Sequence, residues 1–171
     1  QLIAEYDNSG VLLCKTVFGP NIDEPILMVK NGQKYFYHQD GLGSVIDISD
    51  ATANLIQHYE YDAFGKGIYE QETGPTTRFR FQSNWIILKD SNGRIYQSPT
   101  RIFDSVDGRF LQRDLIHKFG YVGLNDNLYL LVKNHPTFKV DPSGYEEAAL
   151  ARRKTVMRGS RGCERVLNEN L

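Results

Sequence analysis

Two short stretches decide how this chain folds: residues 37–45 read YHQDGLGSV, and residues 59–66 read YEYDAFGK. Both contain an aspartate followed three positions later by a glycine. The aspartate can accept hydrogen bonds from the backbone of its own turn, and the glycine supplies the positive φ that such a turn needs. The pattern recurs along the chain, for example as Asp7…Gly10, Asp40…Gly43, Asp62…Gly65 and Asp141…Gly144. It predicts repeated units of strand, turn and strand, which bury a face only when they stack on neighbours.

The composition around these turns also favours β structure. The 171 residues include 10 Tyr, 9 Phe and 15 Gly but only 2 Met, and aromatic residues are enriched in strands. No amphipathic helical pattern of ten residues or more precedes position 145, so we expect an all-β fold. The expected strands are 34–38, 55–61, 78–81, 94–96 and 128–132. The expected hairpin turns are Asn31-Gly32, Asn92-Gly93 and Asp107-Gly108.

Charge and motif content exclude several classes of protein. The chain has 20 basic and 21 acidic residues, and this nearly neutral net charge argues against a nucleic-acid binder. No apolar run is long enough for a membrane span. The four histidines and two cysteines lack metal-ligand spacing, and no cofactor-binding motif is present, so we expect no metal and no cofactor. The chain begins with Gln1 and has no visible signal peptide, so we interpret it as a fragment of a longer protein.

The net charge and the composition of the sequence change near Tyr145. Residues 1–145 carry a net charge of −3, and residues 146–171 carry +2. The stretch 146–151 reads EEAALA, which begins with acids and is rich in helix formers, so it suits a short helix. Two interpretations stay open for 146–171: a polar C-terminal tail, or the start of a second module.

Taken together, the motifs resemble the YD repeats and the repeat-associated core domain of RHS-repeat proteins. The two opening stretches resemble YD repeats. Residues 101–111, RIFDSVDGRFL, resemble the segment of that family that reads R-x-Y-D-P-x-x-G-R-F. Three shorter motifs follow in the family's order: NLY at 127–129, NHP at 134–136 and VDPSG at 140–144.

The resemblance implies a fold and a division of the chain. In this family antiparallel β-hairpin repeats wind into a spiral β-shell, and the core domain curls inward as a plug. We therefore expect shell repeats at 1–70, the core region at 71–145, and the start of a variable C-terminal segment at 146–171.

The resemblance also implies an aspartyl-type autoprotease that cuts its own chain. The positions that match are Asp114 and Asp141, two carboxylates that would share a proton as general acid and general base. Arg113 would orient a carboxylate or stabilise the developing oxyanion. Cleavage would follow Tyr145, before Glu146, with Pro142 and Gly144 shaping the turn ahead of it. Asp126 is a weaker third candidate.

The sequence departs from the family pattern at the first aspartate. The family usually has Asp-Pro-x-Gly there, whereas this chain has DLIH at 114–117. Proline presets a turn and glycine supplies positive φ, so the loop that holds Asp114 is expected to differ in shape. Asp104-Ser105 likewise replaces the usual Asp-Pro. Both catalysis and simple turn capping remain open as roles for the two aspartates.

Two functions follow from these observations. In the first, the chain is the shell and core of a protein that encapsulates a toxin-like C-terminal effector and releases it by autoproteolysis. Its partners would be the upstream RHS repeats, the effector segment, and secretion-machinery or immunity proteins, with no nucleic acid and no membrane span. In the second, the chain is a non-catalytic YD-repeat scaffold for cell contact or adhesion. Both imply a secreted or cell-surface protein.

Overall fold

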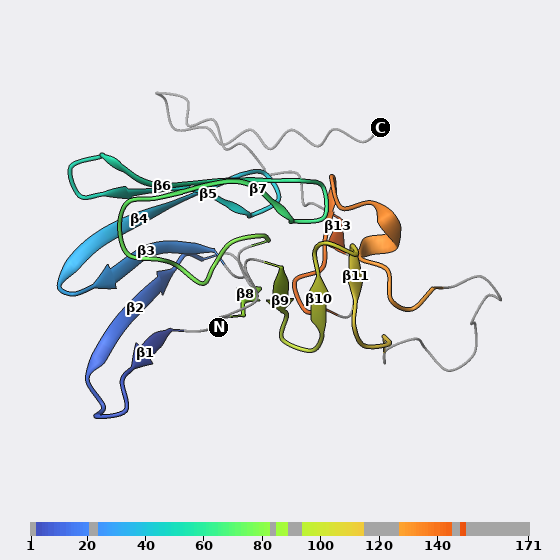
Figure 1. Ribbon diagram of the computed structural model, residues 1–171, viewed down its shortest axis with the longest axis horizontal. Coiled ribbons are helices and arrows are strands. Elements are labelled where there is room, and N and C mark those ends of the chain that lie inside the picture. The colour runs from blue at the N-terminus through green and yellow to red at the C-terminus, as the bar shows by residue number, and fades with distance from the viewer. Residues whose placement is uncertain are drawn as a thin grey trace, which may run out of the picture.

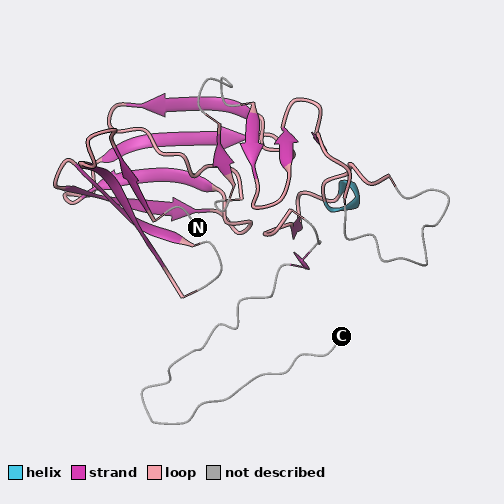
Figure 2. Ribbon diagram, turned by 90° about the horizontal axis from the view of Figure 1, so that it is seen from below, coloured by secondary structure: helices cyan, strands magenta, loops and turns pink. Residues whose placement is uncertain are grey.

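Antiparallel strands joined by tight turns make up most of the protein. The computed structural model describes residues 3–20, 24–82, 85–88, 94–114, 127–144 and 148–149. Figure 1 shows a large, strongly twisted sheet followed by a smaller one, and Figure 2 shows the curvature of the large sheet. The fold is nearly all β, as the sequence predicts, and its one described helix is a single 3₁₀ turn, Val132–Asn134. No helix among the described residues is long and apolar enough to cross a membrane.

The large sheet is an antiparallel meander in which each strand pairs with the next along the chain. The expected strands at 34–38 and 55–61 are confirmed as its fourth and sixth members. Its seven strands are β1 (Ala4–Tyr6), β2 (Leu12–Phe18), β3 (Pro25–Lys30), β4 (Gln33–Gln39), β5 (Val45–Asp50), β6 (Leu55–Tyr61) and β7 (Gly67–Glu72).

Aspartate turns connect several of these strands. In the turns at Asp7, Asp40 and Asp62, the carboxylate oxygen accepts the amides two and four residues later, at 2.8 to 2.9 Å. The amide of the glycine three residues on donates to the aspartate carbonyl at 3.0 to 3.1 Å, and that glycine has a φ of 80° or 83°. The repeated sequence pattern therefore corresponds to one repeated turn geometry.

A further turn of this kind lacks the glycine. Asp50 accepts the amides of Thr52 and Asn54 at 2.8 and 2.9 Å, and Ala53 takes the left-handed conformation with φ 64°. Hydrogen bonds from Asn54 and Thr52 lower the pKa of Asp50 to about 2. The side-chain bonds of Asn54 hold the turn where alanine replaces glycine, which explains why the glycine pattern misses it.

One face of the large sheet is buried, and the chain crosses it after β7. On β4 and β6 the buried side chains alternate with exposed or partly exposed ones. The segment Thr73–Gln82 then passes back over this face (Figure 1). Phe79 completes the first core, whose buried members are Met28, Tyr35, Tyr37, Val45, Ile48, Tyr59 and Phe79.

Arg80 anchors the crossing segment to the far edge of the sheet. Its guanidinium forms ion pairs with Glu70, at 2.8 Å, and with Glu72, and it lies 4.1 Å from the ring centre of Tyr59. The Arg80 side chain is 8% exposed. A buried cation needs such compensation, and two carboxylates and an aromatic face provide it.

The second sheet follows the crossing segment and has the order β11-β10-β9-β8. Trp85 is fully buried in the core that this sheet helps to form, with ring centroids 5.2 Å from Phe103 and 5.6 Å from Phe110. Tyr61 packs against both cores and so connects the two sheets. The strands are β8 (Ile86–Ile87), β9 (Ile95–Gln97), β10 (Ile102–Asp104) and β11 (Arg109–Phe110).

Three sequence predictions are wrong in part. Of residues 78–81, only Phe79 forms a β-bridge, because the neighbouring carbonyl of Arg80 bonds Val45 across the sheet face. Of 128–132, Leu130 alone forms a bridge, with Arg109, before the 3₁₀ turn. The expected helix at 146–151 is not formed at its centre, since β13 (Ala148–Ala149) pairs with β12 (Lys139–Val140). Pairing with β12 overrides the local helix propensity, which tertiary contacts often outweigh.

The hairpin predictions have different outcomes. Asn31-Gly32 is confirmed as the two-residue turn between β3 and β4, with φ values of 53° and 76°. The expected strand at 94–96 appears as β9, one residue later. Asp107-Gly108 lies in a wider connection between β10 and β11, in which only Gly108 of the two has positive φ. Asn92-Gly93 lies outside the described residues.

Gly65 and Gly10 allow a matched test of the repeated turn. Both have left-handed backbones, but a Cβ at Gly65 would overlap the ring of Phe81, whereas one at Gly10 meets nothing within 4 Å. Both alanine variants should lose about 1 kcal/mol or more from the backbone conformation. Gly65→Ala should lose a further ~1–3 kcal/mol from overpacking. Thermal unfolding midpoints measure the difference, and equal losses would contradict the packing of Phe81 on this turn.

Asp104 gives a pH-dependent prediction. Burial alone would raise the pKa of Asp104, but hydrogen bonds from Arg94 and from the backbone of Val106 and Asp107 outweigh it and lower the pKa. A carboxyl whose pKa is lowered by folding stabilises the protein above its unfolded pKa, near 4, and this contribution disappears as the pH falls through the folded value. Asp104→Asn should therefore cost about 1–3 kcal/mol at pH 7. Unfolding midpoints should begin to converge with those of the wild type below about pH 4, as the pH falls toward the lowered folded pKa of Asp104; a constant difference would contradict this.

Candidate functional site

The buried guanidinium of Arg101 is the centre of the candidate site. Arg101 follows a tight turn between β9 and β10, in which its amide donates to Ser98 Oγ at 2.9 Å and Ser98 Oγ donates to its carbonyl at 2.8 Å. The side chain is 4% exposed, and its Cζ lies 3.5 Å from the ring centre of Phe110 on β11. Stacking on the ring fixes the plane of the guanidinium and hence the directions of its N–H groups.

Arg101 brings the two predicted aspartates together. Its Nη2 lies 3.1 Å from Oδ2 of Asp141 and 3.3 Å from Oδ2 of Asp114. The two carboxylate oxygens can therefore be no further apart than the sum of these distances. The Asp141 side chain is 3% exposed and the Asp114 side chain 17%. The two residues are 27 positions apart in the sequence, and in the structure Arg101 contacts the carboxylates of both.

The same guanidinium also holds two backbone carbonyls. Its Nε donates to the carbonyl of Gly144, and its Nη1 donates to that of Leu128 at 3.3 Å. The Leu128 carbonyl accepts the Asp114 amide at 3.0 Å as well. Arg101 thus fixes the loop that carries Asp114 and the turn that begins at Asp141 relative to one another.

Several other side chains hold residues 141–144. Trp85 Nε1 donates to the carbonyl of Asp141 at 3.1 Å, and the Asp141 amide donates to Gln82 Oε1 at 3.3 Å. Thr100 Oγ1 donates to the carbonyl of Ser143 at 2.7 Å. These hydrogen bonds hold the turn against the second sheet and the end of the crossing segment.

Gly144 closes this turn with the same backbone hydrogen bond and positive φ as the glycines of the turns at Asp7, Asp40 and Asp62. Its amide donates to the Asp141 carbonyl at 3.3 Å, and its φ is 76°. Gly144 is buried, and a Cβ at this position would overlap Ser98 Oγ and lie 2.8 Å from Thr100 Oγ1. Glycine is therefore required both for the backbone conformation and for close packing against the β9–β10 turn.

The structure places the remaining predicted residues as follows. Pro142 lies partly buried within the 141–144 turn. Arg113 is exposed, and no described residue forms an ion pair with it, so the contacts expected of Arg113 are made by Arg101. Tyr145, Glu146 and Asp126 lie outside the described residues.

Sequence reasoning missed Arg101 as a site residue. Arg101 is the first residue of the stretch 101–111 that resembles the family segment, so the motif itself pointed to this residue. Proximity in sequence to Asp114 favoured Arg113 instead. Within the described residues, no group of three or more His, Cys, Asp or Glu side chains could hold a metal ion.

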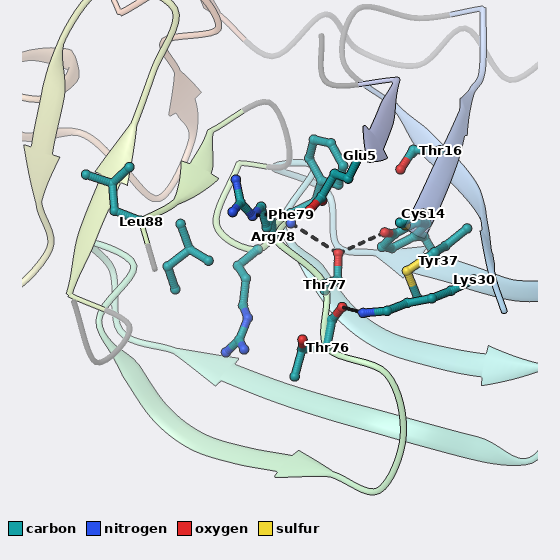
Figure 3. A pocket seen from close by; sticks show the side chains of 13 residues that line it. Glu5, Cys14, Thr16, Lys30, Tyr37, Thr76, Thr77, Arg78, Phe79 and Leu88 are labelled. Carbon is teal, nitrogen blue, oxygen red and sulfur yellow. Dashed lines mark hydrogen bonds and ion pairs between the residues drawn. The ribbon is translucent and has the colours of Figure 1, made fainter. Parts of the chain in front are cut away.

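A separate cavity of about 460 Å³ lies between β2–β4 and the crossing segment (Figure 3). Tyr37 Oη and Thr77 Oγ1 are hydrogen-bonded across it at 2.8 Å, and Lys30 Nζ donates to the carbonyl of Thr76 at 3.4 Å. Burial raises the pKa of Tyr37 and that of the half-buried Cys14 thiol, so both favour their protonated forms. These contacts attach the crossing segment to the sheet.

Comparison with known proteins identifies the family. The Teneurin YD-shell family model matches residues 4–137, and the chain belongs to this family. The resemblance to RHS/YD-repeat proteins drawn from the motifs is thereby confirmed.

The curated relatives are much longer than this chain. The tRNA3(Ser)-specific nuclease WapA of Bacillus spizizenii is 29% identical over 140 residues, which cover 82% of this chain and 5% of that protein. The tRNA(Glu)-specific nuclease WapA of Bacillus subtilis subsp. natto is 30% identical over 113 residues, which cover 66% of this chain and 5% of that protein. The chain thus spans about 5% of the length of these relatives.

Solved structures share the fold. The crystal structure of TcdB2-TccC3 has a TM-score of 0.60 and 20% identity, covering 81% of this chain and 7% of the other. The Tc holotoxin pore of Photorhabdus luminescens has a TM-score of 0.55 and 15% identity, covering 82% and 10%.

Gly144→Ala tests the fit of the 141–144 turn, with Gly43→Ala as its matched control. Both glycines have left-handed backbones in Asp-x-x-Gly turns, but a Cβ at Gly43 meets nothing within 4 Å. Gly144→Ala should loosen the turn, so peptides containing 141–144 should exchange amide hydrogens about tenfold faster or more, the equivalent of ~1.4 kcal/mol. Gly43→Ala should leave those peptides unchanged. Unchanged exchange in both variants would contradict the close contact with Ser98 and Thr100.

Proposed function

We propose that this chain is the shell wall and core of a YD-shell protein that encapsulates a toxin-like C-terminal segment and releases it by cutting after Tyr145. The observation that carries the proposal is the meeting of Asp114 and Asp141 on one guanidinium that also binds the carbonyl of Gly144. Two carboxylates therefore lie beside the backbone immediately before the proposed cut. The division into shell repeats at 1–70, core at 71–145 and effector start at 146–171 is part of this proposal.

The proposed chemistry is hydrolysis of one peptide bond by a pair of aspartates. One carboxylate removes a proton from a water molecule, whose oxygen adds to the carbonyl carbon of Tyr145. The other, protonated carboxyl group donates its proton to the amide nitrogen of Glu146 as the C–N bond breaks. The products are a carboxylate at Tyr145 and an amine at Glu146. The roles of general acid and general base belong to the pair of coupled carboxyl groups.

The nature of the cargo is inferred from the relatives. The WapA proteins are named as tRNA nucleases, and we propose that residues after the cut begin an effector of comparable, toxin-like action. The remaining partners would be the upstream repeats of the same polypeptide and secretion-machinery or immunity proteins. The protein would be secreted or placed at the cell surface.

A second function is favoured by one feature of the same site. A guanidinium that pairs with two carboxylates and stacks on a ring is also a sound structural ion pair, as at Arg80. In this alternative the chain is a non-catalytic YD-repeat scaffold for cell contact or adhesion, and the aspartates hold the core together.

Intact mass spectrometry separates the two functions. The whole encoded polypeptide that contains this chain is expressed as the wild type and as Asp114→Asn and Asp141→Asn. We expect the wild type to be split between Tyr145 and Glu146, and each variant to be cut at least 10³-fold more slowly, because neither dyad can then supply both acid and base.

Asp104→Asn is the control for this experiment. Asp104 is also a buried aspartate bonded to an arginine, Arg94, at 2.7 and 2.9 Å, but it lies at the end of β10 outside the site. This variant should be cut like the wild type. A folded wild-type protein that stays full length would exclude self-cleavage and leave the scaffold function.

A further inference from the structure

We propose that the basic segment 152–165 of this chain docks into a second cavity, which is lined by the aspartate turns at Asp40 and Asp62 and by residues 136–137. This cavity has a volume of about 500 Å³ and is separate from the one in Figure 3. The docked segment follows the proposed cut after Tyr145, so its role as the first part of a cargo rests on the proposed function. The contact itself does not require the cut.

The lining of this cavity combines apolar side chains with carboxylates. Its apolar part comes from Leu42, Ile46, Tyr61, Ala63, Phe81 and Pro136. Its acidic part comes from Asp40, Glu60 and Asp62. Phe81 is 2% exposed and its ring centroid lies 6.1 Å from that of Tyr61, so these two rings form a fixed part of the wall. Such a cavity suits a ligand that has both apolar surface and positive charge.

The carboxylates at this cavity have few basic partners. Within the described part of the chain, neither Asp40 nor Asp62 forms an ion pair, and the Oδ1 atom of each accepts two backbone amides of its own turn. Glu60 is paired with His58, whose Nε2 lies 3.4 Å from its Oε1. Residues 39–66 contain five acidic residues but one lysine and no arginine. This part of the sheet therefore attracts a cation from another segment.

The segment 152–165 has the complementary charge. It contains six basic residues and one acidic residue, and five of the six bases are arginines. A guanidinium can pair with a carboxylate and also pack its plane on an aromatic ring. An arginine-rich segment can therefore contact both the acidic and the aromatic parts of the lining.

The basic segment begins within reach of the cavity. β13 pairs with β12, with Ala149 opposite Lys139, and Thr137, which lines the cavity, lies two residues before Lys139. Paired strands are ~4.8 Å apart and an extended residue spans ~3.3–3.6 Å, so Ala149 lies within about 13 Å of Thr137. The three further residues to Arg152 can span about 10 Å. The first arginines can therefore reach the cavity while the described strands keep their pairing.

Cross-linking within the whole encoded polypeptide tests the docking. The protein carries Asp114→Asn, so that uncut chains are expected, and it is treated with a carbodiimide, which joins a carboxylate to a lysine in direct contact. Peptide mass spectrometry then locates the new bonds. We expect Lys154 to be joined to Glu60, and not to Asp7, which lies in the same kind of turn between β1 and β2.

Removal of the carboxylate charges at the cavity should weaken this cross-link. Asp40→Asn combined with Asp62→Asn keeps the side-chain oxygen that each turn needs and removes two negative charges. The yield of the bond between Glu60 and Lys154 should therefore fall about fivefold. Asp7→Asn is the matched control, because it makes the same change in a turn that does not line the cavity, and it should leave the yield unchanged. Hydrogen exchange in β2 and β3 reports that each variant is folded.

Removal of the positive charges tests the same contact from the other side. Arg152→Gln combined with Arg153→Gln keeps Lys154 as the reporter and should lower its yield with Glu60 by a similar factor, about fivefold. These two arginines lie outside the strands of the large sheet. A lower yield in this variant therefore reports the loss of the contact and not unfolding of the sheet.

The docking is overturned if no bond forms between Glu60 and Lys154, if Glu60 is joined to another lysine instead, or if the yield is the same in all variants. The same measurement on the wild type, with Asp114 in place, separates the docking from the self-cleavage. A wild type that is cut but never forms the bond would reject the docking and retain the cleavage. A wild type that stays full length and forms the bond would reject the cleavage and retain the docking.

Discussion

The contact on which the core depends is the stacking of the Arg101 guanidinium on Phe110 between the β9–β10 turn and β11. A cation that is 4% exposed is costly unless its N–H groups are satisfied, so the surrounding chain has to bring acceptors to it. The acceptors come from Asp114, Leu128 and the 141–144 turn. These three segments contain little regular strand pairing. Their shared contacts with the buried guanidinium of Arg101 therefore fix their positions relative to one another.

The aspartate turn is used for two purposes in this fold. At Asp40 and Asp62 the carboxylate accepts amides of its own turn, so each turn fixes the connection between neighbouring strands. At Asp141 the bond between the glycine amide and the aspartate carbonyl is kept, and the carboxylate reaches Arg101. The same local geometry that closes a shell hairpin thus presents a carboxylate to the buried guanidinium.

Turns that depend on neighbouring residues could be predicted from the sequence, whereas contacts between distant segments could not. The Asp40 and Asp62 turns and the Asn31-Gly32 hairpin follow from residues within five positions of each other, because turn conformations depend on φ preferences and short-range hydrogen bonds. The interpretation of 78–81 as a strand failed because Phe79 and Arg80 bond and pack across a distant sheet face. The pairing of Asp114 with Asp141 was available through family resemblance. The choice of Arg101 over Arg113 depends on the fold, which brings residue 101 rather than the adjacent arginine to the aspartates.

Two buried arginines in this protein each pair with two carboxylates and lie over an aromatic ring, but they constrain these partners differently. Arg80 binds Glu70 and Glu72, which alternate on one strand, so the sheet already fixes the distance between those carboxylates. Arg101 binds Asp114 and Asp141, which lie in separate irregular segments. Removing Arg80 would release the crossing segment, but β7 would still set the distance between the carboxylates of Glu70 and Glu72. Removing Arg101 would remove a contact that the two aspartates share. Although both arginines satisfy the same electrostatic need, Arg80 joins carboxylates of one strand, whereas Arg101 joins carboxylates of two separate segments.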